Sequence, residues 1–164
     1  GMKCEHWERN MKAIMKTGAT INLMCTFNVL CVATFENLLH KVIEWRKEFG
    51  KHSVGLDTPY LKEPPHWMIN ILTPDFIPHM DKTLKFIQDN PEHFHAVEYE
   101  KFKRVTNYMK EHVISEDKIR AGRRDFYSFF SENDKRLGTD LIKTFPQYEE
   151  FYKLCKDVYD NYDK

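Results

Sequence analysis

The chain of 164 residues has no excess of charge of either sign, because 25 Lys and Arg are balanced by 25 Asp and Glu. A protein that binds nucleic acid through its phosphates needs a basic surface, and docking on anionic membranes needs basic clusters. We therefore expect neither nucleic acid nor a membrane among its partners. A net charge of zero also leaves little repulsion between copies of the chain, which favours self-association.

Long apolar runs are lacking as well. The best candidate, residues 30–32, is far shorter than the roughly 20 residues that cross a bilayer. The first residues include Lys3, Glu5 and Arg9 and have no apolar stretch typical of a signal peptide. These features predict a cytoplasmic protein.

Closely spaced cysteines are also missing, since Cys4, Cys25, Cys31 and Cys155 form no Cys-x2-Cys motif. We interpret Cys25 and Cys155 as small core residues, because reduced thiols are commonly buried. A zinc or iron–sulfur site would require distant positions to converge, so we predict no metal site. Gly-x-Ser-x-Gly and glycine-rich phosphate loops are absent too, and we assign no catalytic residue.

What the chain does contain is enough apolar material, 41% of its residues, for one domain spanning residues 1–164. Apolar and polar residues alternate over residues 20–27, which predicts a strand, and residues 53–57 predict a second. Helical patterns flank both, an alternation typical of parallel strands. We predict a helix-rich α/β domain with a small sheet of two to four strands. Residues 1–72 would form its β/α part, and residues 73–164 a helical region packed on it.

A proline-rich loop follows the second predicted strand. Pro64 and Pro65 fix a loop that cannot be helical. We expect Trp67 to anchor this loop against the helices. Residues 67–72 are predicted to form a further short strand.

Two segments carry a resemblance to a known family. Residues 55–74 read GLDTPYLKEPPHWMINILTP, and residues 125–140 read DFYSFFSENDKRLGTD, followed by FPQY at residues 145–148. Together they resemble the C-terminal part of radical S-adenosylmethionine proteins with a twitch region, over residues 7–155. The resemblance implies a partial β/α barrel of which this chain would supply the last strands. Such enzymes hold an iron–sulfur cluster on a Cys-x3-Cys-x2-Cys loop, which this chain lacks.

The resemblance also implies a site at the strand ends. Thr26 and Asn28 would lie near the ribose or amino-acid part of S-adenosylmethionine, and Asp57, Thr58 and Tyr60 would line the pocket mouth. The alternative interpretation is that these residues only end strands and cap loops. Half a pocket rarely buries a ligand well, so we favour the second interpretation.

The function expected from these observations is that of a cluster-less radical S-adenosylmethionine-like fragment or remnant, acting as a binding or assembly module. We expect no cofactor in this chain and no activity from it alone. The alternative is one half of a split enzyme whose iron–sulfur half is a separate chain. The expected partner is accordingly a second copy in a homodimer, or the missing N-terminal half.

Two further clusters have simpler interpretations. His93 and His95 are spaced for a shared metal, but no third ligand is near in sequence, so we interpret them as loop residues. Arg120 and Arg124 are four residues apart on a predicted helix, where interleaved acidic residues favour a salt-bridged solvent face.

Overall fold

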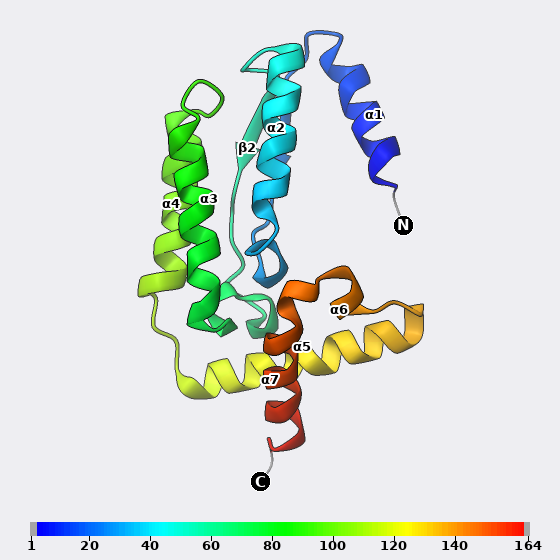
Figure 1. The fold of residues 1–164 in the computed structure, drawn as a ribbon, viewed down its shortest axis with the longest axis vertical. Coiled ribbons are helices and arrows are strands. Elements are labelled where there is room, and N and C mark those ends of the chain that lie inside the picture. The colour runs from blue at the N-terminus through cyan, green and yellow to red at the C-terminus, as the bar shows by residue number, and fades with distance from the viewer. Residues whose placement is uncertain (1–2, 163–164) are drawn as a thin grey trace.

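A computed structural model of the chain describes residues 3–162. Over these residues the chain forms a helix-rich α/β structure, as predicted, in which a two-stranded sheet is flanked by helices (Figure 1). The elements in chain order are α1 (Cys4–Met15), β1 (Ile21–Met24), α2 (Phe35–Phe49), β2 (Val54–Asp57), α3 (Ile77–Asp89), α4 (Ala96–Glu111), α5 (Glu116–Leu137), α6 (Leu141–Thr144) and α7 (Glu149–Asp160).

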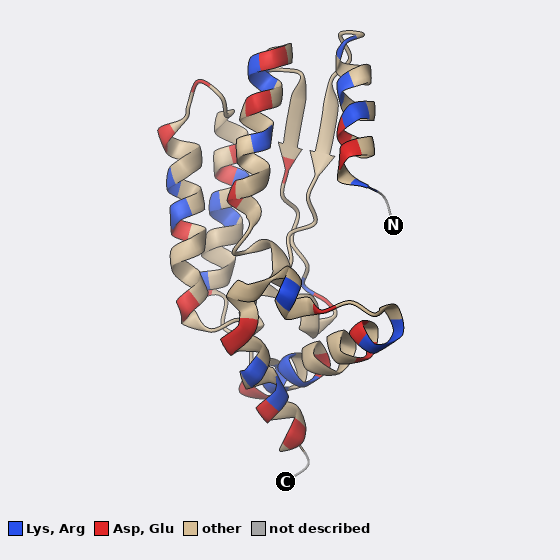
Figure 2. Ribbon diagram, turned by 45° about the vertical axis from the view of Figure 1, so that its right-hand side comes forward, with Lys and Arg blue, Asp and Glu red and all other residues tan. Residues whose placement is uncertain are grey.

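The sheet is parallel, which confirms the prediction from the β/α alternation. Ile21 lies opposite Val54, and Met24 lies opposite Asp57. An isolated bridge between Phe27 and Tyr60 continues the same register beyond the strands. The two arrows in Figure 2 point the same way, so both carboxyl ends lie at the same end of the sheet. Two strands is the lower limit of the predicted range.

One face of the sheet is covered by helices. The residues that alternate onto it, Ile21, Leu23, Val54 and Leu56, are buried or half-buried and belong to the apolar core. Helix α1 contacts β1, and α2 contacts β2. The opposite face carries Met24, which is 73% exposed.

The helices on this face are also joined to one another. The rings of Trp7 on α1 and Trp45 on α2 meet edge to face at 5.8 Å. The indole N–H of Trp45 donates to the Glu8 carboxylate at 2.9 Å. Because an indole that is buried needs a partner for its N–H, this bond allows Trp45 to enter the core.

The prediction of a strand over residues 67–72 is wrong. The chain forms two short 3-10 turns there, at residues 65–67 and 69–71. Four apolar residues of this segment, Met68, Ile69, Ile71 and Leu72, are all buried, so its apolar character serves two buried turns and not a strand. Close packing fixes the turns: a Cβ atom on Gly122 of α5 would lie 2.7 Å from the Ile71 Cγ2 atom.

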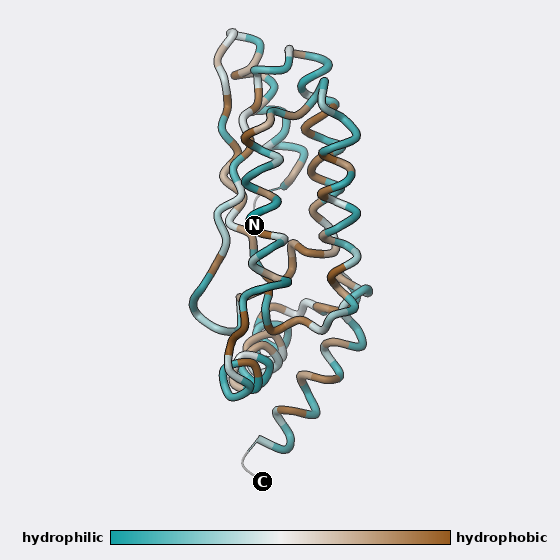
Figure 3. The backbone as a smooth tube through the Cα atoms, turned by 90° about the vertical axis from the view of Figure 1, so that its left-hand side faces the viewer, coloured by the Kyte–Doolittle hydropathy of each residue, from teal (hydrophilic) through white to brown (hydrophobic). Residues whose placement is uncertain are grey.

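Helices α5, α6 and α7 lie at one end of α2, α3 and α4 (Figure 1). Helix α5 runs roughly crosswise to α2, α3 and α4, and α7 packs on it (Figure 1). Helix α5 begins at Ser115, whose hydroxyl accepts the Lys118 N–H, and ends at Gly138 with a φ of 62°. Brown and teal segments alternate along the helix that leads to the C-terminus in Figure 3, and Phe151 of this helix packs against Phe126 of α5 with ring centroids 5.3 Å apart.

A buried tyrosine joins the C-terminal helices to the loop after β1. The Tyr148 hydroxyl donates to the Val29 carbonyl oxygen at 2.8 Å and accepts the Ala33 N–H at 3.2 Å. Burial raises the pKa of Tyr148 well above its usual value, so it stays a neutral donor. The loop of residues 28–33 is therefore held from both sides.

Trp67 is half-buried, less enclosed than an anchor of the loop would be. Its ring packs edge to face on Phe129 and Phe130 of α5, at 5.5 Å from each.

None of the helices that the structure describes combines the length and apolar character needed to cross a membrane.

Candidate functional site at the strand ends

The five residues that the family resemblance singled out lie at the carboxyl end of the sheet, but on different faces of it. The register places Asp57 opposite Met24, on the open face, and the same register carried one residue further pairs Thr58 with Cys25 on the helix-covered face. Thr26 is exposed, and Thr58 is 3% exposed. The fold brings the backbones of these residues together and separates several of their side chains.

Asn28 is engaged in shaping the loop after β1. Its side-chain oxygen accepts the Leu30 N–H at 3.0 Å, and its amide N–H donates to the Thr26 carbonyl oxygen at 3.1 Å. These bonds begin the 3-10 turn of residues 29–31. A ligand that used the Asn28 amide would have to replace this cap.

The three predicted residues at the end of β2 and just after it have different partners. Asp57 pairs with Lys101 of α4 at 3.0 Å, in a partly exposed position. The Tyr60 ring lies 4.4 Å from the Tyr108 ring, and the Lys62 ammonium lies over both. The buried hydroxyl of Thr58 has no hydrogen-bond partner within residues 3–162. Thr58 is thus a predicted residue whose polar group is buried and is not used by the part of the fold described here.

The outer edge of β2 is closed by a buried ion pair that the sequence did not predict. The Arg46 guanidinium donates to the Val54 carbonyl oxygen, and a Glu98 oxygen accepts the Leu56 N–H at 3.0 Å. The two side chains bond each other, with 2.9 Å between Arg46 Nη1 and Glu98 Oε2, and are 0% and 4% exposed. A charged fork therefore satisfies backbone groups that a third strand would otherwise bond.

The charges of this pair are stabilised by several bonds. Burial opposes ionisation of Glu98, yet hydrogen bonds from Arg46 and from the His95 and Leu56 N–H groups hold its pKa below the usual 4.5. Arg46 also donates to the carbonyl oxygen of His93. The only sequence signal was the position of Glu98 three residues after His95, where a Glu side chain can cap a helix start.

Two cysteine thiols also meet at the strand end. Cys25 follows β1 directly, and Cys31 ends the 3-10 turn. Their side chains are in hydrogen-bonding contact, and both are half-buried. The interpretation of Cys25 as an isolated core residue missed this contact, because the turn capped by Asn28 brings Cys31 back toward the strand.

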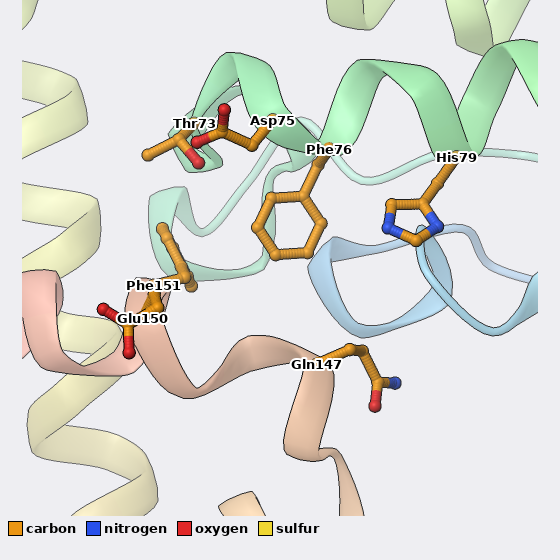
Figure 4. A pocket seen from close by; sticks show the side chains of 7 residues that line it. All are labelled: Thr73, Asp75, Phe76, His79, Gln147, Glu150 and Phe151. Carbon is orange, nitrogen blue, oxygen red and sulfur yellow. The ribbon is translucent and has the colours of Figure 1, made fainter.

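A separate pocket of about 370 Å³ lies between the start of α3 and α7 (Figure 4). Figure 4 shows Phe76 in its centre, with Asp75 and His79 from one side and Gln147 and Glu150 from the other. Its lining includes two carboxylates and no Lys or Arg. Such a lining would disfavour anions and suits a small cationic or neutral polar ligand.

The histidine and arginine clusters contribute to local structure. The His95 ring stacks on His52 with centroids 5.1 Å apart, and His93 Nε2 lies 3.4 Å from the Glu92 carboxylate. Arg120 donates to the Asn161 and Tyr162 carbonyl oxygens, and its guanidinium stacks with the Tyr162 ring. Arg120 therefore binds the C-terminal turn in addition to facing solvent, which the charge pattern did not predict.

Comparisons with protein-family models, with curated proteins and with solved structures found no match to this chain.

Proposed function

We propose that this chain is an assembly module, a cluster-less relative of radical S-adenosylmethionine proteins, which joins a second copy of itself through the open edge of β1. The observation that carries the proposal is the asymmetry of the sheet. Strand β2 has β1 on one side and the Arg46–Glu98 pair on the other, whereas β1 has a strand neighbour on one side only within the described residues.

The chemistry of the β1 edge supports this proposal. Ile21 and Cys25 direct their N–H groups to β2, so the N–H and C=O groups of Asn22 and Met24 point away from it. Exposed edges in monomeric proteins are usually guarded by charges, prolines or bulges. Residues 20–27 contain no charged residue and no proline.

A second copy is the occupant that fits this edge best. An uncharged edge does not repel its own copy, and the net charge of the chain is zero. Antiparallel pairing of β1 with the same strand of another copy would place a two-fold axis near Leu23, and a two-fold interface closes without leaving a further edge. The exposed side chain of Met24 would then be covered.

Light scattering coupled to gel filtration tests the proposal. The expected mass is twice 19.7 kDa, and the variant Met24→Lys is expected to elute as a monomer, because it places a charge beside its own copy across the axis. Val113→Lys is the matched control, since Val113 is 90% exposed in the loop between α4 and α5. A wild-type mass of 19.7 kDa at high concentration would contradict the dimer.

The second candidate is one half of a split enzyme. It is favoured by the convergence of Thr26, Asn28 and Tyr60 at the carboxyl end of parallel strands, where β/α barrels build their sites. Under this alternative, a separate chain with a Cys-x3-Cys-x2-Cys loop would supply the cluster and occupy the β1 edge.

Two measurements on the purified chain address the cofactors. We expect no stoichiometric iron or sulfide after anaerobic reconstitution, because three closely spaced cysteines are missing. We expect no tight calorimetric signal with S-adenosylmethionine, because the Asn28 amide is already used in the loop. Micromolar binding that is lost in Asp57→Asn, but kept in the distant control Asp81→Asn, would favour the split enzyme over the assembly module.

A further inference from the structure

The loop after β1 holds two thiols in a fixed relation. The Cys25 N–H donates to the Asp57 carbonyl oxygen at 2.8 Å, which places Cys25 on the ladder next to β2. The Cys31 N–H donates to the Asn28 carbonyl oxygen at 3.0 Å, which closes the turn. Asn28 caps that turn, and Tyr148 holds both of its flanks. The two sulfur atoms are thereby kept in hydrogen-bonding contact from positions six residues apart.

The two thiols are not equivalent. The Cys25 thiol donates a hydrogen bond to the Cys31 sulfur, which lowers the pKa of Cys31 to about 7; burial works in the opposite direction, and the Asn28 N–H adds a second donor. The same bond, together with burial, raises the pKa of Cys25 above its usual value. The hydrogen bond between the two thiols therefore favours the thiolate form of Cys31 and the protonated form of Cys25. A thiolate is the nucleophilic form of cysteine.

We propose that Cys25 and Cys31 form a dithiol site that closes reversibly to a disulfide by exchange with a low-molecular-weight disulfide. The Cys31 thiolate attacks one sulfur of that disulfide, a mixed disulfide forms, and the other half leaves as a thiolate. Cys25 then loses its proton and attacks the Cys31 sulfur, and the second small thiol leaves. Two protein thiols are oxidised, and one small disulfide is reduced to two thiols.

Thr58 supplies an independent feature of this site. The sheet register places it beside Cys25, it is 3% exposed, and its hydroxyl has no partner in the part of the chain that the structure describes. When the disulfide is reduced, negative charge develops on the leaving sulfur of Cys25, and a free hydroxyl donor beside that position stabilises it. This role accounts for a buried polar group that the fold leaves unused.

The site can be tested on one peptide. Trypsin cleaves after Lys16 and Lys41, so residues 17–41 contain both thiols and no other cysteine. After incubation with oxidised glutathione near pH 7.5, we expect this peptide to be lighter by about 2 Da, to resist alkylation, and to regain both thiols with dithiothreitol. A wild-type peptide in which both thiols are still alkylated would overturn the proposal.

Single variants test which thiol attacks. Cys25→Ala is expected to accumulate a mixed disulfide of glutathione on Cys31, because the resolving thiol is missing. Cys31→Ala is expected to react at least about tenfold more slowly at Cys25, because burial still raises the pKa of that thiol when Cys31 is absent. Equal rates in the two variants would overturn the assignment of Cys31 as the attacking group. If either variant fails to fold, the alkylation rate of wild-type Cys31 against pH provides the same information, with an expected midpoint of about 7.

Discussion

The two outer edges of the sheet differ in whether side chains bond their outward-facing backbone groups. At the β2 edge, Arg46 and Glu98 bond the backbone of Val54 and Leu56, and both charged side chains are almost fully buried. At the β1 edge, Met24 is 73% exposed, and the neighbouring positions carry no charge. One edge is closed by groups from α2 and α4, and within the described residues the other has no strand beside it.

This difference shows that a two-stranded sheet can stop growing without a loop or a bulge. The guanidinium and carboxylate reproduce the donor and acceptor of a missing strand, because each has several hydrogen-bonding groups in one plane. The device depends on α2 and α4, which come from distant parts of the sequence. Helix α1 contacts β1 but brings no comparable pair to its edge within the described residues.

The largest expected effect comes from breaking the closed edge with Glu98→Gln. Arg46 would keep its charge in a buried site without its counter-charge, and removing one partner of such a pair typically costs about 3–5 kcal/mol. We expect the free energy of unfolding, measured by urea denaturation, to fall by that amount.

Lys101→Gln is the matched control for this change. It removes the Lys101–Asp57 pair, whose side chains are 33% and 40% exposed, on the same helix and strand. Exposed pairs contribute about 0–1 kcal/mol. If Glu98→Gln were no more costly than Lys101→Gln, the buried pair would not be what closes the β2 edge.

A smaller effect is expected for Arg46→Lys, which keeps the charge and removes the fork. A single ammonium cannot bond Val54, His93 and both oxygens of Glu98 as the guanidinium does. The loss of charge-assisted bonds should lower the free energy of unfolding by about 1.5–3 kcal/mol. A loss as large as that of Glu98→Gln would mean that the geometry of the fork matters as much as the charge.

The sequence predicted strand β1 better than it predicted the edge of β2. The alternation over residues 20–27 depends on neighbours along the chain, and it predicted a strand there. The ion pair joins Arg46 to Glu98 across 52 positions, and in each helix the residue looks like any other surface charge. No local period marks a charge that will be buried, so this pair could not be predicted.

The same limit explains the other differences. Residues 67–72 are mostly apolar, as a buried strand would be, but a strand needs a neighbouring strand, and this segment instead forms tight turns that pack closely on Gly122. The contact between Cys25 and Cys31 depends on the cap at Asn28, a feature of one turn that spacing between cysteines does not encode. The family resemblance placed Thr26 and Tyr60 at one end of the sheet, and it remains a proposal for their role.

Acid should weaken the closed edge selectively. The folded pKa of Glu98 lies below the usual 4.5, so the carboxylate contributes its full stabilisation above about pH 4.5 and loses it as the pH falls through the folded value. We expect the free energy of unfolding of the wild type to decrease from pH 5 toward pH 3, and the decrease to be shallower in Glu98→Gln. Parallel pH profiles for the two proteins would show that other carboxyl groups dominate the acid response.

The smallest effect on the monomer, and the sharpest test of the open edge, is expected from Met24→Lys. Because Met24 is exposed, replacing it should change the stability of the isolated chain by no more than about 0.5 kcal/mol. Self-association, in contrast, stabilises the folded state with the logarithm of concentration, so the Tm of the wild type should rise by about 1–3 °C for each tenfold increase in protein.

We expect Met24→Lys to abolish that rise and Val113→Lys to keep it, since both place a lysine at an exposed apolar position and only one lies on the edge. Differential scanning fluorimetry over two decades of concentration would measure the slope for all three proteins. A wild-type Tm that does not depend on concentration would mean that the β1 edge stays open in solution. In that case the β2 edge is protected by its ion pair, and the β1 edge is tolerated in solution because it is only a few residues long.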